Sequence, residues 1–224
     1  MRLLEAFAEL IAPTRCAGCD LPGTLLCSAC DETLPRIEAG KACPACAAPF
    51  GGLVCTECWS SEFAFEAALA LGVLDGPLSR AVVLHKDAGE QRLGAVLGTM
   101  LGAVVNAEWG VWPDAVAWVP PTRSALARRG FDHGRALAEP VAATVGRPAV
   151  ALLDRAAGRD QRALGREARA ANAADTFTIS GRAPLHVLLV DDVLTTGATL
   201  DSAANTLLSN GADSVRVAVV ARAW

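Results

Sequence analysis

The segment that spans residues 187–200 constrains the fold of this 224-residue chain more than any other feature. It begins as an apolar run, reaches two adjacent carboxylates at Asp191 and Asp192, and continues through a Thr/Gly-rich loop into a helical pattern. A buried strand followed by a short loop and a helix is the repeating unit of parallel α/β sheets. Ligands of such sheets bind at the carboxyl ends of the strands. The segment therefore predicts an α/β fold with a ligand site at the end of this strand.

The loop after this strand has the chemistry to bind a phosphorylated sugar. Backbone N–H groups at the start of a helix bind phosphate, and three hydroxyls add donors there: Thr195, Thr196 and Thr199. Gly197 allows the backbone to approach a ligand closely. Ionised carboxylates only accept hydrogen bonds, so Asp191 and Asp192 suit sugar hydroxyls and not the phosphate. The alternative, an accidental acidic strand end before a capped helix, leaves the agreement of these features unexplained.

Strand and helix patterns alternate through the rest of the second half of the chain. Short apolar runs predict strands at residues 67–74, 115–119, 149–153, 186–190 and 214–221. Apolar residues at helical spacing predict helices at residues 93–104, 134–145 and 198–208, with Pro140 as a kink or boundary in the second of them. The polar, arginine-rich residues 155–175 predict a long loop. We therefore expect a largely parallel sheet with helices on both faces.

All eight cysteines lie near the start of the chain, in four CxxC pairs: Cys16 and Cys19, Cys27 and Cys30, Cys43 and Cys46, Cys55 and Cys58. A CxxC turn points two thiolates at one position, and two such turns complete a tetrahedral zinc site. Pairing within each unit of two CxxC motifs closes shorter loops and is favoured, while an interleaved cross-brace is the alternative. Disulfides and redox-active pairs are disfavoured for a cytoplasmic chain without a thioredoxin-like context. Because cysteine fills every ligand position, we expect two structural Zn²⁺ sites and no metal catalysis.

These patterns predict two domains. Residues 1–60 would form an N-terminal helix and a double zinc ribbon, because so short a segment needs a metal to fold. Residues 61–224 would form the α/β domain. Residues 1–11 read as an amphipathic helix and not as a signal peptide. No apolar run reaches the roughly 18 residues of a membrane span, so we expect no membrane insertion and a cytoplasmic location.

The charge is uneven along the chain. The formal net charge of −4 argues against a bulk nucleic-acid binder. Residues 122–182, however, contain eleven arginines against six acidic residues, which predicts a local site for an anion. A solvated charged face is an equally good explanation of these arginines.

The order of the motifs resembles the ComF family. After the cysteine module come Lys86 in a His-Lys-Asp-x-Gly-Glu stretch and Pro120–Pro121, and then a series of further matching residues: Arg123, Arg128, Arg129, Gly130, Phe131, Arg155, Gln161, Leu164, Arg166 and Asn172. The acidic pair and its loop are similar to the signature of type I phosphoribosyltransferases that binds phosphoribosyl pyrophosphate (PRPP). The resemblance implies a zinc-ribbon module fused to a type I phosphoribosyltransferase-like domain that binds PRPP with Mg²⁺. It also implies a role in the uptake of single-stranded DNA during natural transformation, with proteins of the competence machinery as partners.

The same resemblance assigns roles to individual residues. It implies that Asp191, Asp192 and Lys86 are the catalytic candidates, with the two carboxylates on the ribose hydroxyls and Lys86 on the diphosphate. A solvated surface lysine is the alternative for Lys86. Arg129 would also contact PRPP, and the loop around the 5-phosphate would comprise Val193, Leu194, Thr195, Thr196, Gly197, Ala198 and Thr199. His85 and His133 could donate protons, although each is more often an ordinary polar residue.

Three positions depart from the pattern of the ComF family. The family usually has Asn-Gln where this chain has Asp132 and His133, and an aromatic residue where it has Asp87. Thr195 stands where purine-salvage relatives have an aspartate proposed to deprotonate the base, so that activity is disfavoured. The alternatives to a PRPP-binding competence protein are a phosphoribosyltransferase acting on an unidentified acceptor and a non-catalytic zinc-ribbon scaffold.

Overall fold

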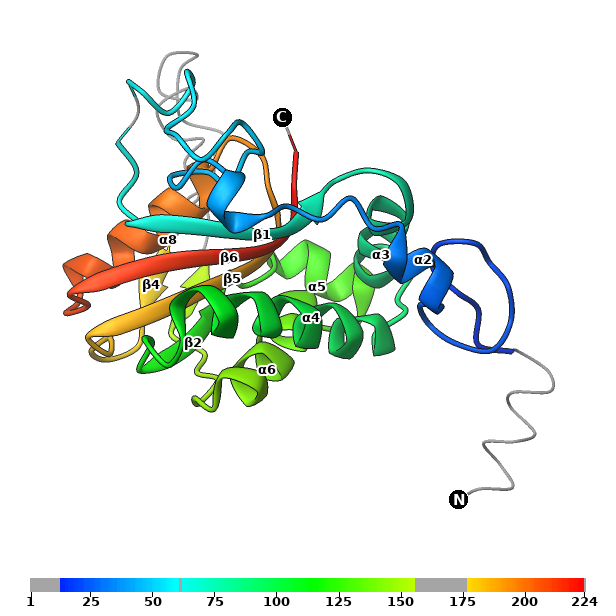
Figure 1. The fold of residues 1–224 in the computed structure, drawn as a ribbon. Helices are drawn as coiled ribbons and strands as arrows, with labels where there is room; N and C mark the ends of the chain where they lie inside the picture. The colour runs from blue at the N-terminus through cyan, green and yellow to red at the C-terminus, as the bar shows by residue number, and fades with distance from the viewer. Residues whose placement is uncertain (1–12, 61, 156–176, 224) are drawn as a thin grey trace, which may run out of the picture.

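The computed structural model describes residues 13–60, 62–155 and 177–223 (Figure 1). The helix predicted for residues 1–11 lies outside these residues, as does nearly all of the loop predicted for residues 155–175. Four residues of the ComF-like pattern also lie outside them: Gln161, Leu164, Arg166 and Asn172. Among the described helices, none is long and apolar enough to cross a membrane.

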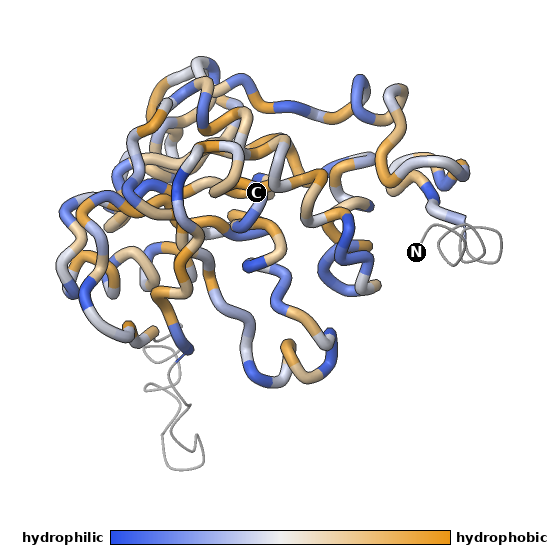
Figure 2. The backbone as a smooth tube through the Cα atoms, turned by 90° about the horizontal axis from the view of Figure 1, so that it is seen from below, coloured by the Kyte–Doolittle hydropathy of each residue, from blue (hydrophilic) through white to orange (hydrophobic). Residues whose placement is uncertain are grey.

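A four-stranded parallel sheet forms the centre of the molecule, with its strands in the order β1-β6-β5-β2. The strands are β1 (Ala67–Val73), β2 (Ala115–Trp118), β5 (His186–Leu194) and β6 (Ser214–Arg222). β6 and most of β5 are buried, as expected for β-branched, apolar strands covered on both faces. The hydrophobic stretches of the backbone run through the interior, and the hydrophilic residues gather mostly at the outer turns (Figure 2). The predicted parallel sheet is therefore confirmed.

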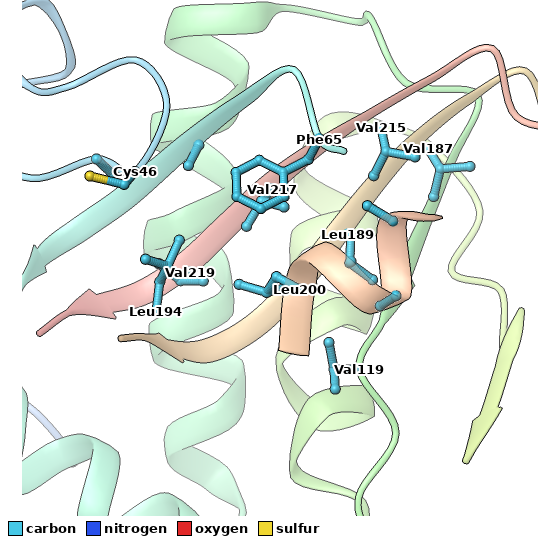
Figure 3. Packing of buried hydrophobic residues seen from close by; sticks show 14 of the residues in the cluster. Cys46, Phe65, Val119, Val187, Leu189, Leu194, Leu200, Val215, Val217 and Val219 are labelled. Carbon is cyan, nitrogen blue, oxygen red and sulfur yellow. The ribbon is translucent and has the colours of Figure 1, made fainter. Parts of the chain in front are cut away.

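Helices cover both faces of this sheet (Figure 1). One face carries α3 (Gly76–Lys86), α4 (Arg92–Trp109) and α6 (His133–Val145), whose buried side chains form one apolar cluster with the sheet. The other face carries α8 (Ala198–Ser209), and Leu200 of this helix packs over Val217 and Val219 (Figure 3). A short α5 (Arg123–Arg129) follows β2. The structure is therefore an α/β fold with a parallel sheet between two layers of helices, as predicted.

Glycines allow α4 and α6 to approach closely. Gly94, Gly98 and Gly102 lie four residues apart on α4. A Cβ at Gly98 would lie 2.5 Å from the Leu137 carbonyl oxygen, and one at Gly94 would lie 2.8 Å from that of Ala136. This contact fixes α6, whose first residues face the candidate site described below.

The cysteine module contains little regular structure and packs against the sheet. It includes α2 (Ser28–Glu32) and the 3₁₀ helix η1 (Ala39–Lys41). Residues 35–44 run along β1: Val73 N–H donates to the Pro35 carbonyl at 2.8 Å and Ala68 N–H to that of Pro44 at 2.9 Å. Cys43 and Cys46 belong to the same buried cluster as α8. The module thus covers the outer edge of β1 (Figure 1).

Three sequence predictions differ from the structure. β5 continues to Leu194, because it pairs with β6 beyond Val190, so the acidic residues lie within the strand and not after it. Pro140 lies inside a continuous α6 and does not end it. The Ala136 carbonyl that loses its helical donor there faces Gly94 instead.

The third difference concerns residues 149–153, which do not form a strand of the main sheet. Ala149 makes a single bridge to Val116. The strand comes later, as β3 (Leu153–Arg155), and pairs antiparallel with β4 (Phe177–Ile179). The Val150 N–H donates to the Val116 carbonyl, and the chain leaves the main sheet after this bond.

Candidate functional site

A cavity of about 370 Å³ opens at the carboxyl ends of β5 and β2. Its floor is the end of β5, and the loop of residues 195–199, called the phosphate loop below, forms one wall. The ends of three helices also line it, with Lys86 of α3, Arg129 of α5 and His133 of α6. The structure thereby gathers in one place residues that are more than a hundred positions apart in the sequence.

The phosphate loop presents backbone N–H groups to this cavity. Gly197 precedes α8 in the left-handed conformation, with φ of 84°, which favours glycine. The first N–H groups of a helix have no partner within the helix and carry its positive dipole end. Thr196 Oγ1 accepts a 3.4 Å hydrogen bond from Ala198 N–H. This end of α8 therefore suits an anionic group such as phosphate.

The acidic pair lies at the floor of the cavity and is almost completely buried. Asp191 Oδ1 accepts a 2.9 Å hydrogen bond from Asp192 N–H, and Asp192 Oδ2 lies 2.6 Å from Lys86 Nζ. Burial raises the pKa of Asp191 to about 8, and the adjacent Asp192 carboxylate adds to the rise. Asp191 is therefore mostly protonated at neutral pH in the ligand-free protein, whereas Lys86 supplies the countercharge for Asp192.

His133, Arg129 and Asp87 form a connected cluster above the acidic pair. Arg129 Nη2 donates to Asp87 Oδ1 at 2.9 Å, and Arg129 Nη1 lies 3.3 Å from His133 Nδ1. A guanidinium only donates, so Nδ1 accepts and the ring proton sits on Nε2, which lies 3.8 Å from Asp192 Oδ2. Burial lowers the pKa of His133 to about 4; Asp192 opposes this change, and Lys86 and Arg129 reinforce it. The lowered pKa keeps His133 neutral at neutral pH, so its ring can donate only from Nε2.

The other two residues noted for their chemistry have structural partners. Asp132 caps α6 through the Arg135 N–H and also accepts a 2.9 Å hydrogen bond from Trp118 Nε1. Each carboxylate oxygen accepts one of these hydrogen bonds, whereas the family's asparagine has only one side-chain oxygen to accept them. His85 is buried, with its ring nitrogens 3.4 Å from the Glu90 carbonyl and 3.3 Å from that of His133. It supports the start of α6 and does not line the cavity.

All of the predicted loop residues line the cavity, whereas only some of the predicted arginines do. Arg155 lines it together with Arg129. Arg123 lines a neighbouring cavity, and Arg128 is exposed and lines neither. Sequence analysis missed Thr122 and Ala125, which also line the site. Thr122 caps α5 by accepting from Ala125 N–H, and a threonine before a helical run was the signal that could have revealed it.

The eight cysteines form two tetrads, each from one unit of two CxxC motifs. The first consists of Cys16, Cys19, Cys27 and Cys30, and the second of Cys43, Cys46, Cys55 and Cys58; ligand atoms within each lie within 4.8 Å of one another. Each tetrad has a sulfur pair 3.7 Å apart. Tetrahedral zinc with Zn–S bonds of about 2.3 Å requires sulfurs about 3.8 Å apart. Both donor sets therefore fit zinc, with the shorter-loop pairing.

Backbone groups favour the thiolate form of one cysteine in each tetrad, Cys16 in the first and Cys43 in the second. Cys27 N–H donates to Cys16 Sγ at 3.3 Å, and Cys55 N–H donates to Cys43 Sγ at the same distance. Burial opposes ionisation, but backbone N–H groups outweigh it and lower the pKa of Cys16 to about 6 and that of Cys43 to about 7. Zinc binds the thiolate, so these hydrogen bonds assist binding.

Comparison with known proteins places this site in a family context. The phosphoribosyl transferase domain family matches residues 134–223. The DNA utilization protein YhgH of Salmonella typhi is 28% identical over 221 residues, which cover 93% of this chain and 96% of that protein. The competence protein ComFC of Streptococcus pneumoniae is 27% identical over 194 residues, which cover 85% of this chain and 84% of ComFC. The predicted resemblance is therefore confirmed.

Two solved structures are among those with some similarity to part of this chain. One is glutamine PRPP amidotransferase from B. subtilis, with a TM-score of 0.41 and 21% identity over 57% of this chain and 26% of that chain. The other is orotate phosphoribosyltransferase from Aeropyrum pernix, with a TM-score of 0.37 and 22% identity over 59% of this chain and 60% of that chain.

Proposed function

Because this chain is homologous over most of its length to YhgH and ComFC of the ComF family, and carries a phosphoribosyl transferase domain, we propose that it binds PRPP with Mg²⁺ and acts in the uptake or utilisation of DNA. One observation carries the ligand: the phosphate loop, the acidic pair and Lys86 face one cavity. The loop takes the 5-phosphate, and the carboxylates take the ribose hydroxyls. Two zinc ions in the cysteine tetrads hold the module together.

The charges of the cavity suit the two ends of PRPP. Lys86 leaves Asp192 for the diphosphate when the ribose hydroxyls and Mg²⁺ reach the acidic pair. Arg129 and Arg155 also line the cavity and add positive charge for the diphosphate. Mg²⁺ prefers oxygen ligands, which the carboxylates and the diphosphate both offer.

Calorimetric titration of the zinc-loaded protein with PRPP and Mg²⁺ tests this proposal. Wild type should bind, and the double variant Asp191→Asn/Asp192→Asn should not, because amides cannot replace both acceptors. Asp213→Asn is the matched control, since Asp213 is an exposed carboxylate that lines neither cavity. A wild type that shows no binding heat at high PRPP concentration would contradict the proposal.

A second cavity gives a specific reason to consider transfer chemistry. It measures about 640 Å³, shares Pro120, Pro121 and Arg155 with the first, and extends to Arg123 and Asp154. An acceptor bound there could attack the ribose carbon as its bond to the diphosphate oxygen breaks. Release of diphosphate from PRPP, assayed with a broad panel of nitrogenous bases, tests this activity. If no base in the panel causes release of diphosphate, binding alone remains as the function.

The exposed arginines of α5 are the best candidates for contact with single-stranded DNA. Arg123 and Arg128 are exposed, whereas Arg129 is occupied by Asp87 and His133. Retention of single-stranded DNA at moderate salt should weaken when Arg123 and Arg128 become alanine, because phosphate contacts depend on positive charge. Arg36→Ala, in the cysteine module, should leave retention unchanged. Equal retention by all these variants would remove α5 from the interface.

A further inference from the structure

Arg222, near the end of β6, links the second cysteine tetrad to the phosphate loop. Its Nε donates to the Cys46 carbonyl at 2.8 Å, and its Nη1 donates to the Leu194 carbonyl at 3.2 Å. Cys46 is a zinc-ligand candidate, and Leu194 directly precedes the phosphate loop. The Leu194 carbonyl also accepts from Ala223 N–H at 2.9 Å. One side chain therefore spans the distance between the two sites.

The burial of Arg222 makes this link energetically important. The side chain is only 3% exposed, and among the described residues no carboxylate forms an ion pair with it. A buried cation without a countercharge is strongly destabilising. A zinc ion held by four thiolates carries net negative charge, so the filled second tetrad supplies the missing countercharge beside Arg222. Emptying the tetrad removes that charge.

A second connection joins the same two parts of the molecule. Phe63, in the segment that leaves the cysteine module, lies against Gly197: a Cβ at Gly197 would be 2.8 Å from the Phe63 ring. Phe63 also stacks on the buried Phe65, with ring centroids 4.6 Å apart. The next N–H, that of Ala64, donates to Asp201 Oδ1 of α8 at 2.7 Å. The chain around the second tetrad is thus linked to the phosphate loop at two points, to Leu194 through Arg222 and to Gly197 through Phe63.

The first tetrad has a different setting. Its unit contacts α3 and α4, through the bond from Arg80 to the Gly18 carbonyl and that from Arg92 Nη1 to Thr14 Oγ1 at 2.9 Å. Among the described residues, no hydrogen bond joins this unit to the phosphate loop. The chain therefore contains a matched internal control for effects of metal on the loop.

From these contacts we propose that Arg222 is a positioning residue through which metal in the second tetrad sets the affinity of the phosphate loop for its phosphoribose ligand. The part of this inference that concerns ligand affinity rests on the proposed PRPP site. Metal in the second tetrad holds Arg222, Arg222 holds the Leu194 carbonyl, and the loop then presents its N–H groups in the binding geometry. Metal in the first tetrad has no such effect.

Linkage gives the proposal a quantitative test in the full-length protein. Cys58→Ser empties the second tetrad and Cys30→Ser empties the first. PRPP affinity should fall by about 5- to 150-fold in Cys58→Ser, the usual range of coupling between two sites, and should change little in Cys30→Ser. Reciprocity requires PRPP to raise the zinc affinity of the second tetrad by the same factor, measured in Cys30→Ser by competition with a chromogenic chelator. Equal zinc affinity with and without PRPP would overturn the proposal.

Variants of Arg222 provide a test that keeps both tetrads filled. Arg222→Met should retain zinc at both sites, bind PRPP more weakly and lose the reciprocal effect on zinc. Arg222→Lys retains the charge but reaches only one carbonyl, so it should recover part of the coupling. If Cys58→Ser fails to fold, the Arg222 variants still test the coupling between the second tetrad and the phosphate loop. Coupling of wild-type size in Arg222→Met would overturn the proposal.

Hydrogen exchange separates this inference from the proposed function. In the ligand-free protein, emptying the second tetrad or replacing Arg222 with Met should speed amide exchange in residues 194–200, whereas Cys30→Ser should not. If wild type fails to bind PRPP, the proposed function fails, yet faster exchange in these residues still supports the link. Unchanged exchange in both altered proteins would refute the link whatever the ligand.

Discussion

At the scale of single residues, the buried acidic pair makes ligand binding depend on pH. The pKa of Asp191 is raised to about 8, so this carboxyl is protonated at neutral pH and must ionise to accept from both ribose hydroxyls and Mg²⁺. PRPP affinity should therefore rise with pH by up to about tenfold per unit and level off above pH 8. Calorimetry in buffers of different ionisation enthalpy should show a proton released on binding.

Asp191→Asn is the control for this pH dependence. The amide cannot ionise, and it keeps an oxygen for the Asp192 N–H. The variant should bind weakly, with no increase in affinity between neutral pH and pH 8. A wild-type affinity that stays constant over this interval would show that Asp191 does not need to ionise. His133 does not complicate the interpretation, because its pKa of about 4 keeps it neutral throughout.

The roles of single residues were only partly predictable. The acidic pair and the phosphate loop are contiguous in sequence, so a local pattern was sufficient to place them in one site. The cluster of Asp87, Arg129 and His133 joins the ends of three helices, and no local pattern indicates such a meeting. Two departures from the family, at Asp87 and His133, turn out to share Arg129 as a partner. Arg222 gave no signal, because its partners are backbone carbonyls distant in sequence.

At the scale of elements, the contact between α4 and α6 depends on glycine. Gly98→Ala should destabilise the protein by about 1–3 kcal/mol, because the new methyl group overlaps the Leu137 carbonyl and overpacked cores resist expansion. Alanine favours a helix over glycine by about 1 kcal/mol, so a gain in stability is the result expected if the close approach were unimportant. Gly40→Ala is the control, since nothing lies within 4 Å of a Cβ there. Denaturant unfolding of both zinc-loaded variants measures the difference.

Elements with strong periodicity were predictable, and short ones were not. The helices at 93–104 and 134–145 have apolar faces long enough to identify, and the structure extends them only at their ends. Sequence analysis missed α3, although Asp75 caps it and Pro77 stands in its first turn, both ordinary start signals. The apolar residues at 149–153 resemble a strand, but tertiary contacts place the ladder later, at β3.

At the scale of the whole molecule, the cysteine module and the α/β domain share one interior. They meet along β1, whose outer edge bonds to residues 35–44. A chain that starts at residue 61 should therefore expose this edge and the buried faces around Phe65, and it should aggregate more readily than the full chain. Light scattering during storage and thermal unfolding measure the effect.

Deletion of residues 1–33 provides the comparison for this prediction. It removes the first cysteine unit but keeps residues 35–44 beside β1. This protein should remain monodisperse with the unfolding temperature only moderately reduced, since the described hydrogen bonds that it loses to α3 and α4 are those from Arg80 to Gly18 and from Arg92 to Thr14. If both truncated chains behave alike, protection of the β1 edge is not the function of residues 35–44.

The strand order has a consequence for how the molecule assembles. β6 lies between β1 and β5, so Ala67 pairs with Arg216 and Val187 with Val215. β1, the first strand in the sequence, thus pairs with β6, the last, and a long segment of chain must close into a loop before they meet. Folds dominated by such distant pairings form slowly, because the chain loses entropy before it gains contacts. We therefore expect the pairing of β1 with β6 to form late in folding. The hydrogen bond from Arg222 to the Cys46 carbonyl should form late for the same reason.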